Sequence, residues 1–328
     1  MNYDSRKNFI TAGILTTMII ALMVAAVEIS GEKEILFPEI AAIATGNLLN
    51  FKRSWNVSPM QMILFITAGA FSGLGIVAFF PGSFILQFIT AFVLSQIMLM
   101  ISGTTFAPMI SAVVLPVVLQ TKSIIYPISA FVFTTLIVIV RITFEKKDIR
   151  PREKSEINRD EICLTRRSVE ILIRALIVFI VASAAIHLNI VFVCAPPLLV
   201  FFTELSNNSS GKTFKETVKI IVFMTICAFD GAVLRYILSM KFLLLPAFTA
   251  AVAVMVYIVV TYIFKMYLPP AGAITLLAFL IPEGSVISYP FQILAGVVFF
   301  AVVINIKEKC KNKVENIKSK REFDIENL

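Results

Sequence analysis

The chain has 328 residues, of which 58% are hydrophobic and only 15% are charged; soluble domains carry about a quarter charged residues. Its mean hydropathy of +0.90 excludes an ordinary soluble protein and indicates an all-α, polytopic membrane protein. The net charge of +8 does not indicate nucleic-acid binding, because basic residues concentrate in connectors and at the C-terminal end. Four cysteines without metal-ligand spacing and a single histidine give no reason to expect a metal, a cofactor or a disulfide framework.

The first half of the chain is predicted to contain six apolar elements, followed by a charged cytoplasmic linker at 145–167. The elements cover residues 9–29, 35–50, 59–80, 83–101, 104–119 and 123–143. Six more elements are predicted before the charged cytoplasmic tail at 307–328. These cover residues 168–188, 190–205, 216–238, 240–266, 268–282 and 286–306. The predicted domains are therefore a first membrane repeat at 1–144, the linker, a second membrane repeat at 168–306, and the tail.

The second and fifth elements of each half are short, with about 15 residues against the roughly 20 that span a hydrocarbon core. We expect them to be tilted, broken or re-entrant, which gives a total of 8 to 12 membrane helices.

The two halves resemble each other in sequence. Residues 36–80 align with 194–238 without a gap, and Gly73 then meets Gly231. Further on, Tyr126 aligns with Tyr289, each followed by proline. The order of these matches predicts an internal duplication, with an even number of elements per half and therefore two parallel repeats.

The distribution of basic residues predicts one orientation in the membrane. With the N-terminus in the cytoplasm, the linker, the tail and the connectors containing Lys52, Arg53, Lys215 and Lys219 all lie inside. The connectors on the other side carry few positive charges. We therefore expect an integral protein of a prokaryotic cell membrane with both termini in the cytoplasm.

Charged residues inside the apolar elements are candidates for coupling or buried-charge roles, because intramembrane charges are energetically costly. Asp230 lies deeper than Arg235, and we expect it to be the titratable or cation-coupling group. Arg235 and Arg174 lie near element ends, where they can snorkel to the interface. Glu39 and Glu204 belong to the short second elements, and the alternative for both is an interfacial acid at a helix end.

Two matching stretches, "SGTTFAP" (102–108) and "YLPPAGAIT" (267–275), begin at the predicted cytoplasmic side. Helix N-termini present free amides and a positive dipole end, which favours anions. The candidate substrate-binding residues are Thr104, Thr105, Pro108, Pro269, Pro270, Gly272 and Thr275. The alternative is that these prolines only begin and end closely packed short helices.

Residues 268–278, "LPPAGAITLLA", resemble the signature of the HPP family of integral membrane proteins, roughly His-Pro-Pro-Gly-Gly-Ala-Thr-Ala-Leu-Leu-Ala. The resemblance covers 170–306, with a fainter copy at 36–143. It implies a membrane transport protein for a small anion, because HPP members have been linked to nitrite transport. Leu268 stands in place of the family's histidine, which puts nitrite itself in doubt. A weaker similarity to the aromatic-acid exporter and fusaric-acid-resistance group implies export of organic anions.

These features together predict a transporter or facilitator for a small anion or weak acid, with its pathway between the two repeats. An enzyme is not expected, because the sequence lacks paired carboxylates and any Ser-His arrangement. An exporter of aromatic or organic acids and a non-transporting subunit of a larger complex are the alternatives. The expected partners are a small solute and the lipid bilayer, and homo-oligomerisation is left open.

Overall fold

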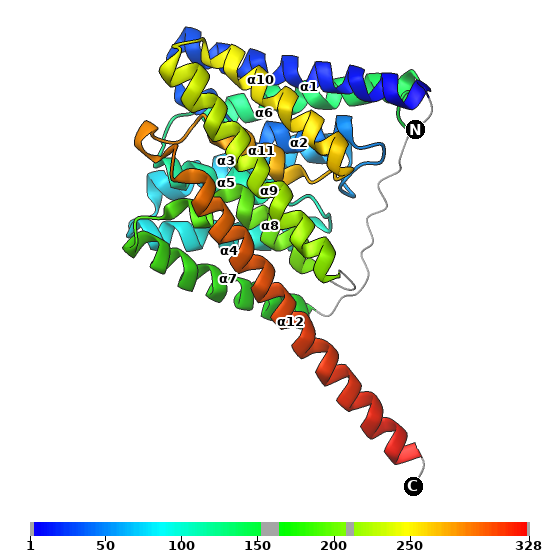
Figure 1. Ribbon diagram of the computed structural model, residues 1–328. Helices are drawn as coiled ribbons and strands as arrows, with labels where there is room; N and C mark the ends of the chain where they lie inside the picture. Colours follow the sequence, from blue (N-terminus) through cyan, green and yellow to red (C-terminus); the bar gives the residue numbers. More distant parts are fainter. Residues whose placement is uncertain (1–2, 152–163, 208–212, 327–328) are drawn as a thin grey trace.

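The computed structural model describes residues 3–151, 164–207 and 213–326, and every regular element within them is a helix. Among these residues, eight helices are long and apolar enough to cross a membrane, which confirms the predicted polytopic helical class. They are α1 (Tyr3–Ser30), α3 (Pro59–Phe79), α4 (Phe84–Ser102), α6 (Ile125–Lys146), α7 (Leu164–His187), α9 (Phe214–Leu234), α10 (Pro246–Phe264) and α12 (Tyr289–Glu326). The last part of α12 extends away from the bundle (Figure 1).

Four short helices occupy the centre of the bundle. They are α2 (Glu39–Ala44), which continues as a π-helix over Thr45–Leu49, α5 (Pro108–Leu119), α8 (Pro196–Asn207) and α11 (Pro269–Leu277). Every residue of α2 and α11 is buried. The short helices contact one another across the two halves, α2 with α11 and α5 with α8 (Figure 1). They correspond to the short second and fifth elements predicted from the sequence.

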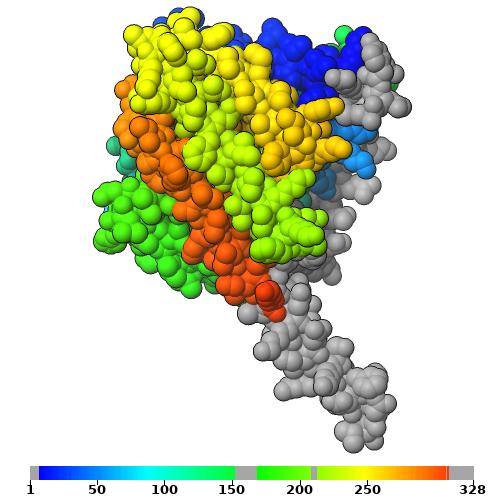
Figure 2. Space-filling model, viewed as in Figure 1, coloured from blue at the N-terminus to red at the C-terminus, as the bar shows by residue number. Residues whose placement is uncertain are grey.

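The long helices surround this centre and expose large apolar side chains on their outer faces. Met18, Leu64, Leu172 and Ile263 are all at least 60% exposed. In the space-filling view, α9, α10 and α12 cover most of the visible face (Figure 2). An apolar exterior of this kind suits contact with lipid, as expected for a membrane protein.

Local sequence signals explain where the helices begin. Ser58 with Gln61 and Thr213 with Glu216 form capping boxes at the starts of α3 and α9. Pro59, Pro108, Pro246 and Pro269 stand at the first turns of their helices, where the missing amide donor is not needed (α3, α5, α10, α11).

The last helix continues beyond its predicted end at residue 306 as far as Glu326, and two boundaries within apolar runs also differ from the prediction. The element predicted at 240–266 begins at Pro246, because α9 runs on as a π-helix over Arg235–Lys241. The element predicted at 268–282 is helical only to Leu277 and then turns. Both differences lie where an apolar run continues through a change of backbone geometry, which composition alone does not reveal.

The connectors gather at two opposite ends of the bundle. At one end the Arg53 guanidinium pairs with the Glu145 carboxylate, and the Asn56 amide donates to the Thr105 hydroxyl. At the other end the Thr121 hydroxyl donates to Glu34. We call the first of these the linker end, because the chain leaves it at residue 151. The predicted topology places the linker end in the cytoplasm.

The two halves repeat the same contacts. Helix α3 packs on α5 and α6, and α9 packs on α11 and α12. The Tyr126 hydroxyl donates to the Ala112 carbonyl at 3.2 Å, and the Tyr289 hydroxyl donates to the Ile274 carbonyl at 2.7 Å. These recurring contacts support the duplication hypothesis, which stays a prediction.

Candidate functional site

A cavity of about 540 Å³ lies at the linker end, between the two halves. Two of its lining residues, Thr105 and Asn207, are exposed, so the cavity reaches the surface there. The lining residues are Asn50, Arg53, Ser54, Trp55, Thr105, Phe201, Glu204, Leu205, Asn207, Tyr267, Leu268 and Pro269. Its wall is therefore mixed, with aromatic rings beside amides, hydroxyls, one arginine and one glutamate.

Four segments build the cavity wall, and each is part of a short helix or adjoins one. They are the loop after α2, the loop before α5, the last turns of α8, and residues 267–269 at the start of α11. The two long helices that lead into these loops end in left-handed residues, Gly103 after α4 and Lys265 after α10. These turns stop the long helices before the cavity, and Pro108 and Pro269 then begin the short ones.

Trp55 joins the two halves across the cavity. Its indole Nε1 donates to the Glu204 carboxylate on α8 at 2.7 Å, and its ring packs edge-on against Phe106. The ring also lies against the backbone of Gly46, where an added Cβ would overlap it. The loop containing Trp55 is thus fixed by contacts with three other segments.

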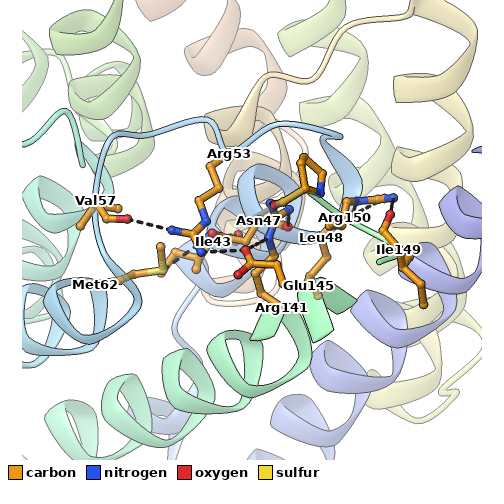
Figure 3. Close-up of polar contacts among 11 residues, drawn as sticks. Ile43, Asn47, Leu48, Arg53, Val57, Met62, Arg141, Glu145, Ile149 and Arg150 are labelled. Carbon is orange, nitrogen blue, oxygen red and sulfur yellow. Dashed lines mark hydrogen bonds and ion pairs between the residues drawn. The ribbon is translucent and has the colours of Figure 1, made fainter. Parts of the chain in front are cut away.

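Three arginines surround the carbonyl end of α2 (Figure 3). Arg141 donates to the Asn47 carbonyl at 2.7 Å, and Arg150 donates to the Leu48 carbonyl at 2.7 Å. Arg53 and Arg141 both pair with the Glu145 carboxylate at 2.7 Å. A helix that ends inside the protein leaves carbonyls unpaired, and these guanidinium groups satisfy them.

The charged groups that line the cavity are one arginine and one glutamate, Arg53 and Glu204. Behind the lining, Arg141 and Arg150 bind backbone carbonyls at the end of α2, and Arg53 and Arg141 share the Glu145 carboxylate. Two further basic side chains lie at the end of α8. Arg174 donates to Asn207 Oδ1 at 2.6 Å, and Lys307 donates to the Ser206 hydroxyl at 3.3 Å.

Three predicted site residues, Thr105, Pro269 and Glu204, line the cavity. Most of the others lie deeper in the packed centre, and Asp230 and Arg235 are partly exposed. The Thr104 hydroxyl bonds with Ser102 Oγ at 2.9 Å. Pro108 and Pro270 are buried in the first turns of α5 and α11.

Gly272 and Thr275 belong to the tightly packed part of α11. A Cβ added at Gly272 would lie 3.2 Å from the Ala41 carbonyl oxygen on α2. The Thr275 hydroxyl donates to the Cys227 carbonyl of α9 at 3.0 Å. In this conformation the cavity therefore reaches the start of the seam between α11 and α2 but not these two residues.

The expectation of free amides at the start of α11 was wrong. Pro269 and Pro270 have no amide hydrogen, and the Ala271 amide already donates to the Leu268 carbonyl at 3.1 Å. A solute at this position would meet the positive end of the helix dipole, but it would take its hydrogen bonds from side chains.

The expected snorkelling of two arginines was also wrong. Arg235 donates to the carbonyls of Ala278 and Ile281, at 2.5 and 2.6 Å, just beyond the end of α11. Arg174 is 5% exposed and donates to Gln96 Oε1 at 3.1 Å. Both guanidinium groups bind the protein interior because short helix ends and buried amides there need donors.

The remaining two predicted charges differ in depth. Asp230 is partly exposed on α9, with one carboxylate oxygen buried and unpaired. Glu39 is 1% exposed at the start of α2, and both of its carboxylate oxygens are buried without a hydrogen bond among the described residues. Glu39 is therefore not the interfacial acid of the alternative prediction, and it is more buried than Asp230, which we had expected to be the titratable group.

Several cavity residues were missed by sequence reasoning, notably Asn50, Ser54, Trp55 and Tyr267. The available signal was the lone tryptophan beside Arg53 in a short polar connector. Its partner, Glu204, is 149 residues away, so only the folded chain reveals the contact.

Comparisons with protein-family models, curated proteins and solved structures find no match to this chain. Within the described residues, no group of three or more His, Cys, Asp or Glu side chains could hold a metal ion.

Proposed function

We propose that this membrane protein is a transporter or facilitator for a small anion or weak acid, and that the solute passes between the two halves. The observation that carries the proposal is the cavity at the linker end, because Arg53 lines it beside neutral hydrogen-bond donors, and Arg141 and Arg150 lie behind the same loop. A guanidinium group matches the geometry and charge of a carboxylate, so the cavity suits an anionic solute. The resemblance of residues 268–278 to the HPP signature supports the same class.

The lining favours an organic acid over nitrite. Trp55, Phe201 and Tyr267 provide aromatic surface that a two-oxygen inorganic anion would not use. Asn50 and Ser54 provide neutral hydrogen-bond donors beside these rings, which suits a carboxylate attached to an apolar body. Aromatic carboxylates are therefore the preferred class within the proposal.

Transport in proteoliposomes tests the proposal. Exchange of labelled benzoate, nitrite and benzenesulfonate is compared with protein-free liposomes, and benzenesulfonate controls for leakage because it stays ionised. Exchange above the leak is expected for at least the aromatic anions. Absence of protein-dependent exchange for all three would refute the proposed function.

A pair of variants tests the location of the pathway. Ser54→Trp fills the cavity and should reduce exchange by about tenfold, which corresponds to roughly 1.4 kcal/mol. Lys52→Trp places the same side chain at an exposed position of the same loop that does not line the cavity, and exchange should be unchanged. Equal exchange by the two variants, at equal protein levels, would exclude a pathway through the cavity.

A further inference from the structure

Glu39 is an isolated carboxyl group in the centre of the bundle. It begins α2, which contacts α1, α5, α6 and α11. The residue is 1% exposed, and neither carboxylate oxygen has a hydrogen-bond partner among the described residues. The site lies between the two halves, since α11 belongs to the second half.

None of the groups that face Glu39 carries an opposite charge. The Ser111 hydroxyl of α5 lies beside the carboxyl and has no other hydrogen-bond partner among the described residues. Tyr126 of α6 and Tyr289 of α12 face it as well, but their hydroxyls donate to main-chain carbonyls. The sequences of α5 and α11 contain no ionisable residue, and α1 contains none between residues 8 and 27. None of the ion pairs among the described residues includes Glu39.

An ionised carboxylate in such a place is very unfavourable. Moving an isolated ionised carboxylate into an apolar medium costs on the order of tens of kcal/mol, and the group binds a proton instead. Protonation of the Glu39 carboxyl removes its negative charge and leaves an O–H group next to the Ser111 hydroxyl. Intramembrane carboxyls that are not engaged structurally commonly mark proton or ion pathways.

We infer that Glu39 is a proton-binding site that couples solute movement to the proton gradient. The inference rests on the proposed transport function. While the centre is closed, as here, the carboxyl keeps its proton. When the seam between α2 and its neighbours opens to water, the O–H bond breaks heterolytically and the proton passes to water on that side. A proton that binds from the other side of the membrane restores the protonated carboxyl, and no redox step is involved.

Helix α2 connects this site to the cavity. Glu39 stands at its first residue and Asn50, which lines the cavity, follows its π-helical end. Eleven helical residues cover about 16 Å, roughly half of a hydrocarbon core. Because π-helical turns are frequent at functional sites, we expect the backbone of Thr45–Leu49 to move when the cavity and the Glu39 carboxyl become connected.

Asp230 provides the matched control. It is an intramembrane carboxyl on α9 with one unpaired oxygen, but it is partly exposed. The substitutions Glu39→Gln and Asp230→Asn each remove one ionisable group and keep the shape of the side chain. Glu39→Met is the second variant at the central site, because an unpaired buried amide is itself destabilising.

The first experiment measures coupling in proteoliposomes that contain an internal pH dye, with benzenesulfonate as the probe. A pH gradient of one unit should concentrate the probe about tenfold through the wild type and through Asp230→Asn. Glu39→Gln and Glu39→Met should still exchange the probe but should neither accumulate it nor move protons with it. Tenfold accumulation by either Glu39 variant would overturn the inference. If the wild type exchanges no probe, the proposed function fails, and the second experiment decides the status of Glu39.

The second experiment needs no solute. Infrared difference spectra between acidic and alkaline buffer are recorded for the full chain in liposomes. The carbonyl band of a protonated carboxylic acid should be present in the wild type and in Asp230→Asn, and the Glu39 component should be absent from Glu39→Gln and Glu39→Met. Identical spectra for the wild type and both Glu39 variants would overturn the inference, whatever the transport result.

Discussion

Two glycines hold the long helices of each half against the short ones. Gly73 of α3 lies against the Val113 carbonyl of α5, and an added Cβ would overlap that oxygen. Gly231 of α9 lies in the same way against the Thr275 carbonyl of α11. The obstacle in both cases is backbone, which cannot rotate away as a side chain can. Gly73→Ala and Gly231→Ala should therefore both destabilise the protein.

The change in the free energy of unfolding that we expect for Gly73→Ala is the sum of two opposing contributions. Overpacking against backbone belongs to the upper part of the usual range, about 3 kcal/mol. Replacing glycine by alanine inside a helix stabilises the helix by about 1 kcal/mol. The net loss expected for Gly73→Ala is about 2 kcal/mol of the free energy of unfolding. A second contact at 3.0 Å, to Pro116 Cγ, makes relaxation of α5 harder.

Gly75 is the control, because it lies two residues further along the same helix with nothing within 4 Å of an added Cβ. Gly75→Ala should stabilise the protein by up to about 1 kcal/mol. The free energies of unfolding are compared from unfolding equilibria in mixed detergent micelles. The two alanine variants of α3 should thus differ by about 3 kcal/mol. Equal stability of Gly73→Ala and Gly75→Ala would refute the close approach of α3 to α5.

The remaining predictions concern the end of α11 and the cavity. Arg235→Gln should lower the free energy of unfolding by about 3 kcal/mol, because two buried carbonyls lose a charged donor. Lys52→Gln, at an exposed position, should change it by less than about 0.5 kcal/mol; equal effects would contradict the role of Arg235. In a cysteine-free background, Ser54→Cys should react with an impermeant maleimide in inside-out vesicles only, and Thr275→Cys should react in neither orientation. Labelling of Ser54→Cys from the opposite side would reverse the predicted topology.

The outer helices were predictable because each depends on a local property, an apolar run of membrane-spanning length. The short central helices were also visible in outline, since Pro108 and Pro269 stand at their starts. The burial of these short helices could not be read from composition, because lipid-facing and protein-facing segments are equally apolar. The end of α11 at Leu277 likewise depends on packing, not on a sequence breaker.

The site was only partly predictable. Thr105, Pro269 and Glu204 were found because they lie next to the prolines or carry charge in a short element. The loop at Asn50 and Trp55 was missed because its role depends on contacts with α8 and with the loop before α5. Such contacts join residues that are far apart in the chain, and one sequence contains no record of them.

The buried charges divide into two groups when their partners are considered. Arg141 and Arg235 bind the carbonyl ends of short helices α2 and α11, so their charge is used to satisfy backbone groups that lipid cannot satisfy. Replacing either arginine should therefore lower the free energy of unfolding, and any effect on transport should be a consequence of that loss of stability. Glu39 makes no ion pair or side-chain hydrogen bond among the described residues, and a carboxyl group kept unpaired at an energetic cost needs another explanation. The absence of such a partner is therefore what distinguishes Glu39, the proposed proton-binding site, from these two arginines.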